Sequence, residues 1–219
     1  KQGHIYIRCK YAVVEYDIKK NTFHTIRDND IQAITYDNAR LWVCTRDSLF
    51  TYNRVEDRLD YYYNLEGVRM SCVTEDSAGN LYVGTMNNGL YMIDHNKKWL
   101  NYFPKKDITC IYEDSKKSIW VGTKDDGLFR LDRNGGITNY GTAPHQNMLS
   151  SSYVRCVVED NLGNYWIGTF KGLDKLDVTT GTFTHYSKDN KPYSLSNSSI
   201  ICMMKDRQGT FWIGTYYGG

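Results

Sequence analysis

The chain has 219 residues, and its 27 Lys and Arg nearly balance its 25 Asp and Glu, for a formal net charge of +2. This balance argues against a nucleic-acid partner, which would require a clear excess of cationic residues. No run of about eighteen apolar residues occurs, so we expect no membrane contact by this segment, and no signal peptide stands at its start. The first residue is Lys1 rather than Met, which favours a piece of a longer protein.

A short motif centred on an aromatic residue recurs six times along the chain. The distances between the central aromatic residues are 36, 40, 38, 46 and 46 residues. A period in this range indicates one supersecondary unit repeated several times. The copies are Ile5–Cys9, Leu41–Thr45, Leu81–Thr85, Ile119–Thr123, Tyr165–Thr169 and Phe211–Thr215.

Each repeat contains four short runs rich in β-branched and aromatic residues, with turn residues between them. Such runs are typical of antiparallel strands, and no stretch shows the apolar spacing of a helix. Four strands in a unit of about forty residues predict an all-β fold and, within it, a β-propeller blade. We place the units of this single domain, residues 1–219, at about 1–30, 31–69, 70–107, 108–153, 154–199 and 200–219. The first unit lacks its first strand and the last stops after two, which gives 21 strands.

An Asp stands six residues before the central aromatic in four copies and five residues before it in the second copy, at Asp37. We expect each carboxylate to accept backbone N–H groups in a tight turn, and the Gly that often follows to adopt a positive φ. These Asp and Trp residues are therefore interpreted as scaffold, not as catalytic groups. The four are Asp76, Asp114, Asp160 and Asp206.

Four of the six cysteines occupy one repeat position, which Ala33 holds in the second unit. Equivalent positions on successive blades lie farther apart than the ~7 Å between Cα atoms that a disulfide allows. We therefore expect a small buried position and no disulfide among Cys72, Cys110, Cys156 and Cys202. No Cys or His spacing typical of a metal site occurs, so neither a metal nor another cofactor is expected.

The sequence resembles the two-component regulator propeller repeat. The fifth copy carries the resemblance most fully, in residues 160–169 followed by Gly172 and Leu173, and the Ser-rich stretches 149–152 and 195–199 resemble the family's lead-in to the first strand. The resemblance implies a partial propeller, about five four-stranded antiparallel blades of roughly seven. It also implies the periplasmic sensor region of a hybrid histidine kinase of the Bacteroides type, anchored in the inner membrane.

The same resemblance implies the partners and the mechanism. Such regions sense oligosaccharides, and the parent protein is expected to be a homodimer in which the remaining blades, a membrane helix and the kinase lie outside this chain. Ligand binding would shift a dimer between two arrangements and so start a phosphorelay. No catalytic residue is expected in this segment, because no kinase motif occurs in it.

Loops between the second and third strands are the candidate ligand-binding sites. They emerge at the same end of a blade as the connectors between blades, and binding residues concentrate in loops held by a rigid scaffold. Their amides, charges and tyrosines suit hydroxyl-rich sugars. The candidate residues are Arg46, Asp47, Asn87, Asn88, Lys124, Asp125, Asp126, Lys171, Tyr216 and Tyr217.

Two long connectors, residues 141–152 and 187–199, mark the same end of the blades, because insertions on one face of a repeat protein often indicate a binding face. Their candidate residues are His145, Gln146, Asn147, Lys191 and Tyr193. Most tyrosines at repeat positions, among them Tyr186, are expected to pack between blades. The expected exposed aromatic residues are Tyr62, Trp99, Tyr216 and Tyr217.

Two other classes of function stay open. A propeller hydrolase or lyase acting on glycans would need a cluster of catalytic groups, which the sequence does not single out. A generic protein-interaction propeller would use the same loops for a protein partner.

Overall fold

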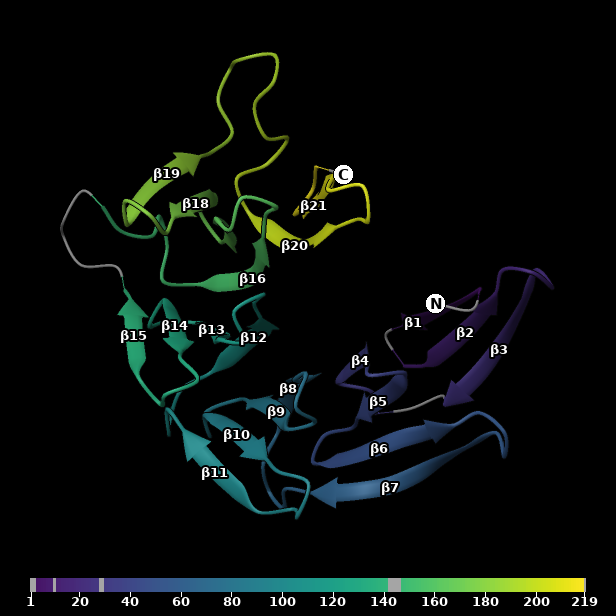
Figure 1. Ribbon diagram of the computed structural model, residues 1–219. Coiled ribbons are helices and arrows are strands. Elements are labelled where there is room, and N and C mark those ends of the chain that lie inside the picture. The colour runs from purple at the N-terminus through teal and green to yellow at the C-terminus, as the bar shows by residue number, and fades with distance from the viewer. Residues whose placement is uncertain (1–2, 10, 28–29, 142–146, 219) are drawn as a thin grey trace. The chain divides into compact units, whose positions relative to one another are not determined.

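A computed structural model describes residues 3–9, 11–27, 30–141 and 147–218 (Figure 1). Over these residues the chain forms 21 β-strands in six antiparallel sheets, with no helix. The all-β prediction and the strand number are confirmed, since the first sheet has three strands, the last has two and the others have four. We number the sheets blades 1 to 6 in chain order. His145 and Gln146 lie outside the described residues.

The chain divides into two compact units, Lys1–Tyr102 and Phe103–Gly219. Unit 1 holds blades 1 to 3, each a meander of neighbouring strands. Blade 1 is β1 (His4–Arg8), β2 (Val13–Asp17) and β3 (Thr22–Arg27); blade 2 is β4 (Ala33–Asp37), β5 (Arg40–Cys44), β6 (Ser48–Asn53) and β7 (Arg58–Asn64); blade 3 is β8 (Met70–Glu75), β9 (Leu81–Thr85), β10 (Leu90–Ile93) and β11 (Trp99–Tyr102).

Unit 2 holds blades 4 to 6, in which the first strands of successive blades pack against one another. Blade 4 is β12 (Ile108–Glu113), β13 (Ile119–Thr123), β14 (Leu128–Leu131) and β15 (Ile137–Tyr140); blade 5 is β16 (Val154–Glu159), β17 (Tyr165–Thr169), β18 (Leu173–Asp177) and β19 (Thr182–Tyr186); blade 6 is β20 (Ile200–Lys205) and β21 (Phe211–Thr215).

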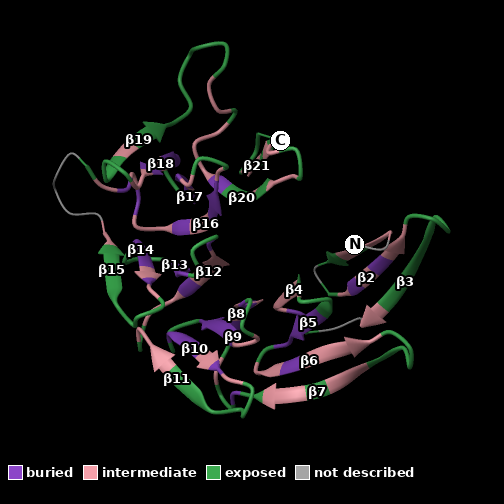
Figure 2. Ribbon diagram, in the orientation of Figure 1, coloured by how far each residue is buried: buried purple, intermediate pink, exposed green. Residues whose placement is uncertain are grey.

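In blades 2 to 5 the second strand is buried on both of its faces, whereas the fourth strand is half-buried or exposed (Figure 2). In β5, Leu41 and Val43 join a core that includes Val13 of blade 1, while Trp42 and Cys44 join a core that includes residues of blade 3. Side chains of a strand alternate between its two faces, and here both faces meet apolar neighbours. This explains why the repeated motif is a continuous apolar run.

The turn Asp holds both the turn and the central Trp. Asp114 accepts the backbone N–H groups of Lys116 and Ser118 at 2.9 and 2.8 Å, and its Oδ2 accepts the indole N–H of Trp120 at 2.8 Å. The turn bonds were predicted, but the indole bond was not, and it accounts for the six-residue spacing. The same indole bond joins Trp166 to Asp160 at 3.1 Å and Trp212 to Asp206 at 3.0 Å.

The glycine that follows the turn Asp adopts the expected left-handed conformation. Gly79, Gly163 and Gly209 have φ values of 87°, 81° and 88°. In blade 4 the position belongs to Lys117, whose φ is 68°. A left-handed conformation is costly for a residue with a Cβ atom, so we attribute its retention there to the bonds that Asp114 makes.

Blade 2 solves the same problem in another way, because its turn is one residue shorter. The indole N–H of Trp42 donates to Oε2 of Glu75, in the next blade, at 2.7 Å. Asp37 instead accepts the backbone N–H of Glu75 at 3.2 Å. In blade 2 the indole bond within the blade is therefore absent, and two hydrogen bonds to Glu75 of blade 3 take its place.

Each repeat cysteine lies opposite the glycine of the neighbouring strand. Cys110 pairs with Gly122 and Cys156 with Gly168 in the strand registers. A Cβ atom added to Gly122 would lie 2.4 Å from Sγ of Cys110 and 2.9 Å from Cγ1 of Val154 in the next blade. The glycine thus makes room for both the thiol and the next blade.

In blade 2 the small and the large member of this pair are exchanged between strands. Ala33 stands where the other blades have cysteine, and its register partner is Cys44, where they have glycine. The pair therefore needs one very small residue and one thiol-sized residue, on either strand. All six cysteines have free thiols.

Two tyrosine predictions were wrong. Tyr62 is half-buried, since its ring packs edge-on against Trp42 at 4.8 Å, while its neighbour Tyr61 is 63 % exposed. Tyr186 stacks on Trp166 at 5.6 Å but stays 42 % exposed. Trp99, Tyr216 and Tyr217 are exposed, as predicted. A pattern of period two could not distinguish Tyr61 from Tyr62 because the register of β7 shifts at this point.

Candidate functional site

The connectors and the loops after the second strands share one end of each blade, which we call the connector end. A buried Thr closes each loop: the hydroxyl groups of Thr123 and Thr169 donate to the carbonyls of Gly127 and Gly172 at 2.8 and 2.9 Å. A Cβ atom on either glycine would lie 2.7 Å from a backbone carbonyl oxygen. The hydroxyl bond explains the Thr of the repeated Gly-Thr element, and the close approach explains the Gly of the Gly-Leu element.

At the connector end, one backbone hydrogen bond recurs in four blades. It joins the first loop residue to the residue that leads into the first strand, and we call these two residues the paired positions. This backbone bond is the same in the four blades, whereas the side chains at the paired positions differ from blade to blade. The bonds are Met86 N–Arg69 O at 2.8 Å, Lys124 N–Asp107 O at 3.1 Å, Phe170 N–Tyr153 O at 3.0 Å and Tyr216 N–Ser199 O at 2.9 Å.

In blade 4 the connector end is charged and internally compensated. The ammonium of Lys124 lies 3.9 Å from the carboxylate of Asp107, and that of Lys106 lies 2.7 Å from Asp126. Asp125 is exposed between these two pairs. Exposed ion pairs of this kind contribute little to stability, so the scaffold does not require them.

In blade 5 the paired positions are aromatic, and both rings lie close to the guanidinium of Arg155. The rings of Tyr153 and Phe170 stack at 6.2 Å with an interplanar angle of 13°. The guanidinium of Arg155 lies 4.6 Å from the Tyr153 ring and 5.3 Å from the Phe170 ring. Phe170 is 52 % exposed, and the adjoining Lys171 is also exposed.

Blade 6 continues this surface. Tyr216 and Tyr217 are 52 % and 88 % exposed, and their ring centroids are 4.3 Å apart. Ser199 links the two blades, because its hydroxyl accepts NH1 of Arg155 at 2.9 Å and its carbonyl accepts the N–H of Tyr216. We call Tyr153, Arg155, Phe170, Tyr216 and Tyr217 the aromatic patch.

Unit 1 carries the remaining predicted loop residues. Arg46 is exposed, and its N–H lies 3.3 Å from the carboxylate of Asp30. Asp47 contributes to the structure of the loop, because its backbone carbonyl accepts the N–H of Leu65 at 2.8 Å. Asn87 and Asn88 are exposed, and Asn87 has a φ of 63°.

Three predicted residues, Lys171, Tyr216 and Tyr217, thus lie at the connector ends of the neighbouring blades 5 and 6. Sequence reasoning missed Tyr153, which precedes the first strand of blade 5, and Arg155, which is the second residue of that strand. The loop pattern gave no reason to single them out.

A groove of about 590 Å³ lies beside the connector 187–199 in unit 2. Trp166, His185, Lys191 and Tyr193 line it, and Tyr193 is fully exposed. Lys191 and Tyr193 were predicted from connector length. Asn147, predicted on the same ground, instead supports the end of β19, where its side-chain oxygen accepts the N–H of Phe183 at 2.7 Å.

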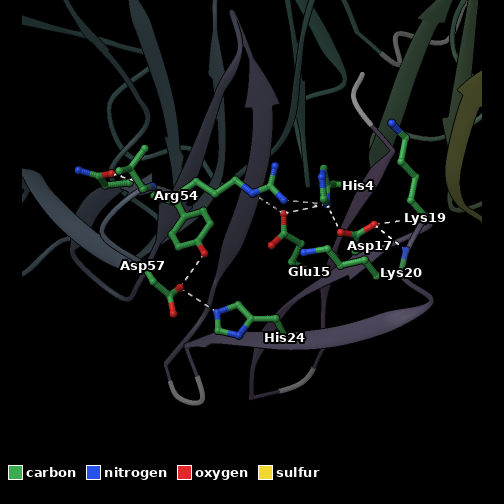
Figure 3. Close-up of polar contacts among 11 residues, drawn as sticks. His4, Glu15, Asp17, Lys19, Lys20, His24, Arg54 and Asp57 are labelled. Atoms are coloured by element: carbon green, nitrogen blue, oxygen red, sulfur yellow. Dashed lines mark hydrogen bonds and ion pairs between the residues drawn. The ribbon is translucent and has the colours of Figure 1, made fainter.

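A charged cluster joins blades 1 and 2 within unit 1 (Figure 3). The carboxylate of Glu15 is nearly buried, and its Oε1 lies 3.2 Å from Nδ1 of His4 and 3.3 Å from Nε of Arg54, in the turn after β6. Burial, followed by Glu15, raises the pKa of Tyr6 to about 12. These charges compensate one another, so we interpret the cluster as a joint between blades.

The described residues contain no group of three His, Cys, Asp or Glu side chains placed to hold a metal ion. None of their secondary structure forms a helix that is long and apolar enough to cross a membrane.

Three segments, residues 102–125, 148–171 and 194–217, match the family model of the two component regulator propeller. Each matched segment contains both paired positions of one blade, namely those of blades 4, 5 and 6. These three segments therefore match the repeat that the sequence resembles.

Solved structures support the propeller fold. The extracellular domain of the hybrid two component system BT3049 from B. thetaiotaomicron is 26 % identical, with a TM-score of 0.83 over 100 % of this chain and 31 % of that one. The corresponding domain of BT4673 from the same organism is 21 % identical, with a TM-score of 0.83 over 99 % of this chain and 30 % of that one. The chain thus spans less than a third of the length of these domains.

More distant structures share the fold alone. Virginiamycin B lyase from Staphylococcus aureus is 13 % identical, with a TM-score of 0.76 over 100 % of this chain and 75 % of that one. The comparison with curated proteins gave no match.

Proposed function

We propose that this chain is the ligand-sensing part of an extracytoplasmic, non-catalytic receptor region of a two-component sensor kinase, and that it recognises oligosaccharides at its connector end.

 The observation that carries this proposal is the set of paired positions, whose backbone bond is constant while their side chains differ from blade to blade. A scaffold alone does not require such variation. The resemblance to the extracellular domain of BT3049 supports the sensor class.

The aromatic patch suits a sugar ligand. Exposed aromatic rings can stack on the apolar faces of sugar rings, and hydroxyl-rich ligands need donors and acceptors placed around such a ring. Phe170, Tyr216 and Tyr217 offer exposed rings, and Tyr216 and Tyr217 also offer phenol groups. The signalling step would be a shift between two arrangements of a homodimer of the parent protein, towards the one that binds the ligand better.

Calorimetric titration of the 219-residue chain with a panel of oligosaccharides tests this proposal. We expect at least one to bind, and the double variant Phe170→Ala and Tyr216→Ala to weaken it about tenfold or more. The matched control is Leu162→Ala, an 86 % exposed apolar residue in the turn after β16. Silence across the panel, or binding that ignores the double variant, would reject the proposal and favour a protein partner.

A second candidate function rests on a separate observation. Asp174 is fully buried, accepts the N–H and hydroxyl of Ser150 at 2.8 and 2.9 Å, and has its Oδ1 2.7 Å from Nδ1 of His185. The equivalent residues in blades 3 and 4 are Tyr91 and Phe129. An imidazole oriented by a buried carboxylate at a groove is the arrangement of a general base, which favours a glycan hydrolase or lyase.

Incubation of the chain with the same panel separates the two candidates. A sensor leaves every glycan intact, whereas an enzyme releases new reducing ends or unsaturated products. Turnover that disappears in His185→Gln would establish the enzyme. Unchanged glycans would remove this candidate.

A further inference from the structure

We propose that the aromatic patch binds an acidic saccharide, with the guanidinium of Arg155 as the partner of its carboxylate or sulfate group. This inference rests on the proposed function and specifies its ligand class. It follows from the geometry of Arg155, from the other blades at the same position and from the charges around the patch.

The guanidinium of Arg155 is held in place before any ligand arrives. It lies against the rings of Tyr153 and Phe170, at 4.6 and 5.3 Å. Its NH1 donates to the hydroxyl of Ser199 at 2.9 Å and to the carbonyl of Ile200 at 3.3 Å. A guanidinium has five N–H donors, and both of these bonds use NH1. The donors on Nε and NH2 can therefore serve an anion, and the ordered side chain loses little freedom on binding.

The scaffold does not need an arginine at this position. The equivalent residue in blade 4 is Thr109, and its hydroxyl donates to the carbonyl of Val154 at 2.6 Å. Arg155 makes the same kind of contact with Ile200, so a hydroxyl group would suffice for the junction between blades. What arginine adds is a positive charge and a planar set of donors, which match carboxylate and sulfate oxygens.

The charges around the patch agree with this assignment. Lys171 adjoins Phe170 and adds a second cation, and the patch itself contains no carboxylate. Within the described part of the chain, neither Arg155 nor Lys171 forms an ion pair. The connector end of blade 4 differs, since Lys124 and Lys106 each lie near an Asp. At the connector end of blade 5, unlike that of blade 4, the cationic side chains can therefore form an ion pair with an anionic ligand.

The test compares one sugar in charged and neutral form. The chain is titrated with galacturonic acid trisaccharide and with its methyl ester, in which each carboxylate is replaced by a neutral ester of nearly the same shape. We expect the acid to bind at least about tenfold more tightly, as expected for charge-assisted hydrogen bonds. A sulfated and an unsulfated galacto-oligosaccharide of equal length form the second arm and show whether sulfate can replace carboxylate.

Variants then locate the effect. Arg155→Gln is expected to reduce the affinity for the preferred acid to that of its neutral form, and Arg155→Lys to retain part of the preference. The control Lys116→Gln removes an exposed cation in the turn at the opposite end of blade 4 and should leave the preference intact. The comparison of acid and neutral sugar is made on the unaltered chain, so it remains a valid test even if Arg155→Gln does not fold.

The outcomes separate the inference from the proposed function. If charged and neutral forms bind equally in both arms, or Arg155→Gln keeps the preference, the acidic ligand class is overturned while oligosaccharide sensing stands. If no saccharide of any charge binds, both are overturned.

Discussion

The two ends of blades 4 and 5 use side chains in opposite ways. At the turn end, Asp114 and Asp160 make the same bonds to the turn and to the central Trp, so the residues repeat. At the connector end, a backbone bond repeats while the paired side chains change from Asp107 and Lys124 to Tyr153 and Phe170. The side chains of the turn end therefore stabilise the blade, whereas the side chains of the connector end can vary because the backbone makes the repeated bond there.

Removing the buried carboxylate at the turn end should have the largest effect on the free energy of unfolding. Asp114→Ala leaves the indole of Trp120 and the hydroxyl of Tyr165 without their acceptor, and both groups are buried. We expect the free energy of unfolding in urea to fall by about 3 to 5 kcal/mol. Asp206→Ala is the matched control, because Trp212 is 59 % exposed and water can replace the lost bond. Equal losses in the two variants would contradict the role given to burial.

A methyl group at the Cys–Gly pair should have the next largest effect. Gly122→Ala places a Cβ atom 2.4 Å from Sγ of Cys110, so we expect a loss of about 1 to 3 kcal/mol in unfolding free energy. Adding Cys110→Ala should restore part of it. Gly141→Ala, whose nearest neighbour would lie at 3.6 Å, is the control. Additive effects of the two substitutions would show that the residues do not share one space.

Alkaline pH should destabilise the fold in part through the turn end of blade 4. Burial, followed by the bond to Asp114, raises the pKa of Tyr165 well above its ordinary value of 10.0. The folded state therefore favours the neutral phenol, so its contribution is complete below pH 10 and is lost as pH rises further. The slope is at most about 1.4 kcal/mol per pH unit.

Urea unfolding between pH 9 and 11 measures this slope. Tyr165→Phe should flatten the decline, whereas Tyr217→Phe, on the exposed aromatic patch, should leave it unchanged. A slope that is the same in all three proteins would show that Tyr165 does not govern it.

Neutralising the connector end of blade 4 should have the smallest effect. Lys124 is half exposed and 3.9 Å from Asp107, so Lys124→Gln should change the unfolding free energy by less than about 0.5 kcal/mol. Thermal or urea unfolding measures it. A loss above 1 kcal/mol would mean that the connector end also stabilises the blade.

The repeat was readable from the sequence because each copy obeys the same local chemistry. The Asp turns, the Gly conformations and the buried second strands follow from residue types and spacing alone. Contacts between repeats were not readable in this way. The bond from Trp42 to Glu75 and the ion pairs of Glu15 join residues that no local pattern connects.

The candidate site was predicted in part for the same reason. Loop position indicated Lys171, Tyr216 and Tyr217, since loops after a second strand can be recognised from the motif. Arg155 is the second residue of a strand whose pattern otherwise indicates scaffold. Its significance depends on the rings of Tyr153 and Phe170, which only the folded chain brings to it.

The Cys–Gly pairs also determine how the thiols react. Burial raises the pKa of Cys72 to about 11 and that of Cys156 to about 12, so both remain protonated at neutral pH. The thiolate is the form that attacks oxidants and disulfides, so these two thiols should react slowly. Cys9 and Cys202 are exposed and should be alkylated first. A fold that hides most of its cysteines beneath a neighbouring strand can pass through an oxidising compartment with those thiols unchanged.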